Sequence, residues 1–278
     1  MSSTNFTVPK GVKKIDCFCV GGGGAADSDC RCSGGGGGGY TSTKLGVDVN
    51  PGQDISVVVG AGQINNSIFN QTGTAPSSCV GSICSANGGF SACGEYDIDK
   101  RDGGSGGSGG GKAGANGGSD GGNGSANFEG FTGGQGQGTT TRYFGESNGT
   151  LYAGGGGGAG QYRGDDSPNV ATFTSKGGDG GGGKGAYAWL FYGWNELSSA
   201  EPGSPNTGGG AGGSLISSGS VTGGGGGGYT TTKLAQSVTP GSPISVVVGA
   251  GGVCSLSEFN GKNGGSGICI IRWDDQKS

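Results

Sequence analysis

Histidine is absent from this sequence, methionine occurs once and proline only eight times. Without histidine the chain cannot form a Ser-His-Asp or Cys-His arrangement, and it lacks the commonest general base of enzymes. Adjacent carboxylates occur at Asp165-Asp166 and Asp274-Asp275, but neighbouring residues of an extended chain point to opposite sides. The residues therefore do not indicate an enzyme.

Clustered positive charge and long apolar runs are also missing. The net charge is −4, and the lysines and arginines are scattered, so we expect no nucleic-acid partner. No apolar run approaches the roughly 18 residues of a membrane-spanning helix, and residues 1–10 do not resemble a signal peptide. We therefore expect that the protein does not insert into a membrane. We expect it to be synthesised in a cytosol, and then to stay there or to be released by lysis or as part of a particle.

Glycine dominates what is present, with 76 of the 278 residues, against an ordinary usage of about 7%. Collagen is excluded, because there is no Gly-Xaa-Yaa period. Aromatic and apolar residues punctuate the glycine runs, which is unlike a flexible linker. The remaining interpretation is a bundle of polyglycine-II helices. These are extended, left-handed and three residues per turn, and their peptide groups must bond to neighbouring helices.

An internal repeat organises the chain, since Gly34–Gly62 returns as Gly223–Gly251 with most positions identical. Each copy has a six-glycine run, a strand-like segment and a Pro-Gly turn into Ile-Ser-Val-Val-Val. We predict that each copy is a β-hairpin-like unit and that both copies contribute paired strands to one β body. Further strands are predicted at Phe6–Pro9, Lys14–Val20 and Gly267–Trp273.

The predicted fold is mainly β, a β-sandwich-like body with a bundle of polyglycine-II helices and essentially no α-helix. We expect one glycine-rich domain over residues 1–278. Its β body comes from 5–62 and 223–273, and 63–222 form the polyglycine-II and loop region.

Nine cysteines are present. Cys17, Cys19 and Cys269 stand where valines of buried strands would, and buried thiols pack as small apolar groups. A zinc site from Cys17, Cys19, Cys30 and Cys32 would lack the usual Cys-Xaa2-Cys knuckle, so no metal is expected. Disulfides among Cys79, Cys84 and Cys93 remain an alternative if the mature protein reaches an oxidising medium.

Two glycine runs, Gly106–Lys112 and Gly178–Lys184, fit the Gly-Xaa4-Gly-Lys part of a phosphate-binding loop. Ala113 and Gly185 replace the Ser or Thr that such a loop needs. We read each as a lysine that ends a glycine run, and we expect no cofactor.

Four stretches carry a family resemblance: FTVPKGVKKIDCFCVGGGG, GGGGGGYTTTKL with the later ISVVVGAGG, GQGTTTRYFGESNGTLYAGGGGG and GGSGICIIRW. In this order they resemble the glycine-rich domain of phage tail fibres. A related sandwich of polyglycine-II helices forms the tip of some phage tail-fibre adhesins, where loops at the distal edge bind the host receptor. The resemblance implies a virion surface protein, with other virion tail proteins and a host-cell surface receptor as partners. Homo-oligomerisation stays open, as does the choice between tip adhesin and fibre subunit.

The most aromatic stretch runs from 186 to 194, and large non-glycine excursions of this kind are where a rigid scaffold carries function. Its rings either pack on a neighbour or the bundle end, or form an exposed recognition loop. The candidate receptor-binding residues are Tyr187, Trp189, Phe191, Tyr192 and Trp194, with Tyr162 and Arg163 close by. Two alternative functions are a self-assembling structural filament and an ice-binding protein, although the glycine spacing is too irregular for the latter.

Overall fold

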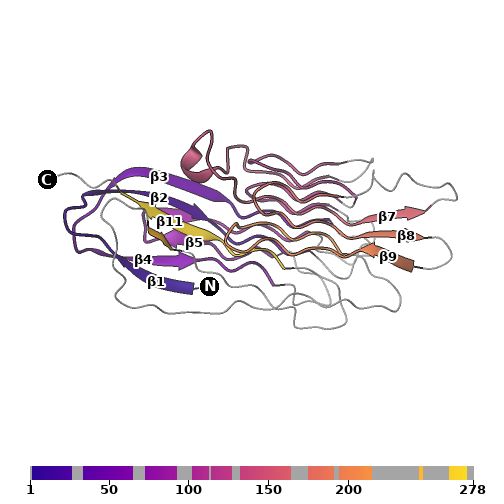
Figure 1. The fold of residues 1–278 in the computed structure, drawn as a ribbon, viewed down its shortest axis with the longest axis horizontal. Coiled ribbons are helices and arrows are strands. Elements are labelled where there is room, and N and C mark those ends of the chain that lie inside the picture. Colours follow the sequence, from indigo (N-terminus) through magenta and orange to yellow (C-terminus); the bar gives the residue numbers. More distant parts are fainter. Residues whose placement is uncertain are drawn as a thin grey trace.

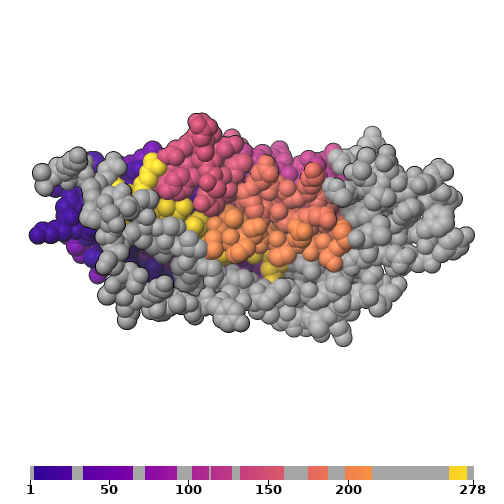
Figure 2. All heavy atoms as spheres, in the orientation of Figure 1, coloured from indigo at the N-terminus to yellow at the C-terminus, as the bar shows by residue number. Residues whose placement is uncertain are grey.

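The structure is a computed structural model that describes residues 2–26, 34–64, 73–92, 102–112, 114–126, 132–163, 175–190, 194–214, 244–246 and 263–273. A β body lies at one end, and glycine-rich segments run from it along the long axis to a small sheet at the other end (Figure 1). Figure 2 shows the glycine-rich segments 132–159, 175–186 and 198–214 side by side on one face.

Two antiparallel sheets form the β body. The first has the order β1-β4-β5-β6 and consists of Ser2–Thr7, Asp54–Val59, Ser78–Val80 and Cys84–Ala86. The second has the order β10-β11-β2-β3 and consists of Ile244–Val246, Ile268–Arg272, Lys14–Val20 and Thr41–Asp48. The described residues contain no α-helix, only the single 3-10 turn η1 at Tyr143–Gly145. The prediction of a mainly β fold without α-helix is confirmed.

The core of the body lies between the inner faces of the two sheets, where alternate residues of β2 and β4 are buried. From β2 these are Ile15, Cys17 and Cys19, and from β4 they are Ile55, Val57 and Val59. The thiols of Cys17, Cys19 and Cys269 are unpaired and at most 1% exposed, as predicted for cysteines in valine positions. Cys79 and Cys84 are also free thiols, and Cys30, Cys32 and Cys93 lie outside the described residues.

The opposite face of the second sheet is covered by the segment around η1. Phe18, Val20, Ile268 and Ile270 form a second buried cluster with Phe144 and Ala153, and Tyr143 and Tyr152 pack against it. This segment and strands β5 and β6 come from 63–222, which the sequence assigned to glycine helices and loops. The β body therefore draws on more of the chain than predicted, because short strands between glycine runs give little periodic signal.

The hairpin prediction for the first repeat copy is wrong. Strand β3 pairs with β2, whereas β4 pairs with β1 and β5 in the other sheet. The link between them is anchored to the connection between β1 and β2, since Val49 donates to the carbonyl of Lys13 and Gly52 to that of Val8. The Pro-Gly link thus carries the chain from one sheet to the other, where β4 buries Ile55, Val57 and Val59.

The second repeat copy contributes β10, which pairs with β11 in the second sheet. Its equivalent in the first copy, within β4, lies in the first sheet. The Ile-Ser-Val segments at 55–57 and 244–246 therefore lie in different sheets although their sequences are identical. Residues 223–243 and 247–251 lie outside the described residues.

The glycine run 34–39 shows how the bundle is built. Donors three residues apart reach the same neighbouring segment: Gly36 and Gly39 donate to the carbonyls of Ala211 and Gly208 at 2.8 and 2.7 Å. The same spacing holds for two further pairs, Gly35 and Gly38 to Gly111 and Ser108, and Gly37 and Tyr40 to Phe90 and Asn87. Hydrogen bonds with a period of three and no bond within the run are the signature of a polyglycine-II helix.

The carbonyls of the same run accept from other segments. Gly36 accepts from Gly156, Gly37 from Gly24, and Gly35 and Gly38 from Gly104 and Gly107. Six short segments therefore surround this run: 21–24, 87–90, 104–107, 108–111, 153–156 and 208–211. Only glycine fits at the centre, since a Cβ on Gly36 would lie 2.2 Å from the Gly24 carbonyl oxygen.

Candidate functional site

The predicted aromatic segment lies in a three-stranded sheet at the end of the bundle remote from the β body (Figure 1). Its order is β7-β8-β9, from Gly160–Arg163, Tyr187–Leu190 and Trp194–Ser198. We call it the distal sheet. The sequence predicted a loop here, and this is corrected: most of the segment is β-strand, in keeping with its aromatic composition.

The strand register brings the two predicted groups of site residues together. Strands β7 and β8 are parallel, with Tyr162 opposite Trp189 and Arg163 opposite Leu190. Strand β9 runs antiparallel to β8, with Trp194 also opposite Leu190. Because side positions alternate along a strand, positions 162, 187 and 189 share one face of the sheet. Phe191 and Tyr192 lie outside the described residues.

Glycine runs hold the distal sheet in place. Gly158, at the end of the run that leads into β7, donates to the carbonyl of Ala115, and Ala186, directly before β8, donates to that of Gly213, each at 2.9 Å. Ala159 and Ala186 are at most 1% exposed. Strands β7 and β8 thus begin at backbone that is fixed by the bundle.

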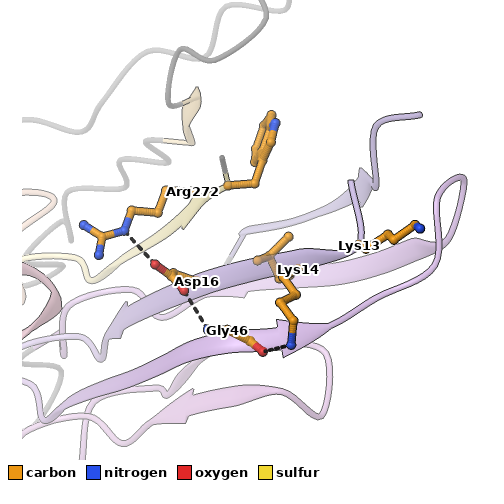
Figure 3. Close-up of a pocket in the computed structure, with 7 residues that line it drawn as sticks. Lys13, Lys14, Asp16, Gly46 and Arg272 are labelled. Atoms are coloured by element: carbon orange, nitrogen blue, oxygen red, sulfur yellow. Dashed lines mark hydrogen bonds and ion pairs between the residues drawn. The ribbon is translucent and has the colours of Figure 1, made fainter. Parts of the chain in front are cut away.

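The β body carries a hollow of about 290 Å³, shown in Figure 3. It is lined by Lys13, Lys14, Ile15, Asp16, Gly46, Arg272 and Trp273. Arg272 Nε donates to Asp16 at 2.9 Å, and Asp16 also accepts the amide of Gly46 at 2.7 Å. Lys14 is paired with Asp48 at 2.8 Å.

Arg272 links this hollow to the segment that covers the second sheet. Its guanidinium pairs with Glu146 at 2.5 Å and lies 3.9 Å from the centre of the Phe144 ring. Burial alone would lower the pKa of Arg272, but the hydrogen bonds to Glu146 and Asp16 outweigh it and raise that pKa. Because Arg272 and Lys14 are already paired, the hollow is better explained as a cluster of ion pairs that fixes strand ends than as a ligand site.

The phosphate-loop alternative can be checked at Gly106–Lys112. The amides of Gly109, Gly110 and Gly111 donate to carbonyls of other glycine runs at 2.8 to 3.0 Å, so they are not available to a phosphate. Lys112, with 1% of its surface exposed, is enclosed in the bundle, and burial lowers its pKa while Asp102 partly offsets the shift. The run is part of the scaffold, as the sequence indicated.

No group of three or more histidine, cysteine or acidic side chains arranged to hold a metal ion occurs in the part of the chain that the structure describes. Among those same residues no helix is long and apolar enough to cross a membrane.

Fold and site together define a mainly β protein in which a bundle of glycine helices joins a sandwich to a distal sheet. The family model for the glycine-rich domain matches residues 1–222. The chain belongs to this glycine-rich domain family. A search of curated proteins found no match.

Proposed function

We propose that this protein is a phage virion surface protein, a tail-fibre or tail-tip adhesin that binds a host-cell surface receptor through its distal sheet. The observation that carries the proposal is the position of that sheet at the end of the glycine bundle opposite the β body (Figure 1). One end is then free for attachment to other virion tail proteins, while the other faces the host.

The composition of the distal sheet supports a role in recognition. Tyrosine and tryptophan give large contact area for little side-chain entropy and dominate binding hot spots. Positions 162, 187 and 189 on one face are Tyr, Tyr and Trp. Arg163, opposite Leu190, adds a cation at a position on the other face of the same sheet.

Adsorption of purified protein to host cells tests the proposal. Mass spectrometry of purified particles first identifies the phage that contains the protein and hence its host. Fluorescently labelled wild type is then compared with a Tyr162→Ala/Trp189→Ala variant on cells of that host. The matched control is Phe90→Ala, which removes an aromatic ring that is 44% exposed and lies outside the distal sheet.

We expect the double variant to melt like the wild type and to lose most cell binding, while the Phe90→Ala protein binds normally. Normal binding by the double variant would place recognition elsewhere. Absence of the protein from particles would contradict the virion assignment. A double variant that binds cells but no longer self-associates would favour the structural filament.

A further inference from the structure

Two buried thiols from opposite ends of the chain meet in the core of the β body. Cys19 lies in β2 and Cys269 in β11, and the register places them directly opposite each other. Their Sγ atoms are 3.6 Å apart, and neither residue is more than 1% exposed. We propose that Cys19 and Cys269 form a disulfide when the folded protein meets a small peroxide oxidant, and that this bond locks the closing strand onto the opening strand.

The backbone already has the geometry that a disulfide needs. Directly opposite residues of antiparallel strands have Cα atoms about 4.5 to 5.5 Å apart, within the range of about 4.4 to 6.8 Å found for disulfides. The sulfur atoms must approach by about 1.5 Å to reach the usual S–S length of about 2.05 Å. Side-chain rotation at Cys19 and Cys269 can supply that movement without shifting either strand.

The neighbouring thiols are less suited to the reaction. Cys17 is equally buried in β2, but its partner in β11 is Ile271. Cys84 also hydrogen-bonds with Cys19, but it lies in β6 of the facing sheet, so no strand pairing holds its Cα directly opposite that of Cys19. Among these thiols, Cys19 and Cys269 are the pair that the strand register places directly opposite each other.

The chemistry balances with hydrogen peroxide as oxidant. One thiol, as its thiolate, attacks a peroxide oxygen, forms a sulfenic acid and releases hydroxide, which the thiol proton converts to water. The second sulfur then attacks the sulfenic sulfur, the S–S bond forms and a second water leaves. Two thiols and one peroxide thus give one disulfide and two waters. Hydrogen bonds with Cys269 and Cys84 together with burial raise the pKa of Cys19, so the reaction is slow at neutral pH.

The bond would have a large effect on the unfolded chain, because it closes a loop between residues 250 positions apart. Long closed loops restrict the unfolded ensemble most. We therefore expect the oxidised protein to melt at a higher temperature than the reduced protein, by several degrees.

Peptide mapping tests the proposal on the full-length chain. The protein is purified with reductant, incubated with hydrogen peroxide, alkylated in denaturant and digested without reduction. We expect a linked pair of peptides containing Cys19 and Cys269, with a mass two hydrogens below the sum of the free peptides. In parallel, we expect oxidation to raise the melting temperature of the wild type and of Cys17→Val, but not of Cys269→Val.

Cys17→Val is the matched control, since it removes an equally buried thiol from the same strand. Mapping of the wild type does not require any variant to fold. The proposal is overturned if peroxide leaves both thiols free to alkylation, if it produces only isolated sulfinic or sulfonic acids, or if Cys19 is found linked to Cys84.

Discussion

The amide of Gly156 donates to the carbonyl of Gly36 at 2.8 Å, joining two glycine runs that are far apart in the sequence. Gly36 in turn donates to Ala211, so a single residue ties together three segments of the bundle. Such contacts replace the side-chain packing of an ordinary core. They require that no side chain stand between the backbones, which makes the stability of the bundle unusually sensitive to a single methyl group.

Gly36→Ala should therefore be strongly destabilising. Its Cβ would lie 2.2 Å from the Gly24 carbonyl oxygen, so the surrounding segments must move apart. We expect a loss of about 2 kcal/mol or more in the free energy of unfolding, and a larger loss for Gly36→Val. Urea denaturation measures it. Gly122→Ala is the control, because Gly122 is exposed and a Cβ there approaches only the Ser119 oxygen at 3.0 Å. Equal stability of both variants would mean that the run is not packed as described.

Removal of the closing strand should unfold the body, although the family model ends at residue 222. Strand β11 lies between β10 and β2 and buries Ile268, Ile270 and Ile271. These side chains contribute about 1.5–3 kcal/mol each, which together is comparable to the whole stability of a domain. A chain ending at 262 should show no cooperative melting by circular dichroism, whereas one ending at 273 should melt like the full chain. Cooperative melting of the shorter chain would show that the strand is dispensable.

Arg272→Met should cost about 1–2 kcal/mol of stability. The change removes the hydrogen bonds to Asp16 and Glu146 and the contact with Phe144, and leaves two carboxylates without their cation. Lys14→Met is the matched control, because the Lys14–Asp48 pair is 64% and 85% exposed. Such exposed pairs contribute about 0.5 kcal/mol or less. If both variants lose the same small amount in urea titrations, the Arg272 network does not hold the covering segment in place.

Asp120 should make stability fall in acid. Its pKa is lowered by the hydrogen bond from the Thr140 hydroxyl, then by the Thr141 amide and by Arg142, against a smaller opposing effect of burial. Because the pKa of Asp120 is lower in the folded than in the unfolded protein, its ionised carboxylate stabilises the fold at pH values above the ordinary pKa of 3.8. This contribution is lost as the pH falls toward the folded-state pKa. The stability difference between wild type and Asp120→Asn should therefore be largest above about pH 4 and shrink toward pH 2. A difference that does not change with pH would exclude this role.

Several strands of the β body could be predicted from the sequence, whereas β5, β6 and most of β1 could not. Lys14–Val20 and the Ile-Ser-Val-Val-Val segment have the β-branched composition and the apolar alternation of half-buried strands. The sheet to which each strand belongs could not be predicted. A Pro-Gly link is compatible both with a hairpin and with a connection between two sheets. In the structure it connects β3 to β4 in the other sheet, an outcome that depends on long-range packing.

The segments to which each glycine run hydrogen-bonds could not be predicted from the sequence, for a different reason. A glycine run has no side chains, so nothing in its sequence distinguishes Ala211 from any other neighbour of Gly36. The pairing of Tyr162 with Trp189 was equally hidden, because it depends on how the bundle aligns the runs that precede β7 and β8. The glycine runs themselves were the only signal, and they predict the type of helix but not which segments surround it.

Hydrogen exchange of the glycine amides tests the central claim most directly. The account requires that Gly35, Gly36, Gly37, Gly38 and Gly39 each donate a hydrogen bond to another segment, at 2.7 to 3.0 Å, inside a rigid bundle. These amides should exchange as slowly as those of β2 and β11, with protection lost only on global unfolding. Exchange of the run 34–39 at the rate of an unstructured peptide, while β2 and β11 stay protected, would contradict the bundle and with it the placement of the distal sheet.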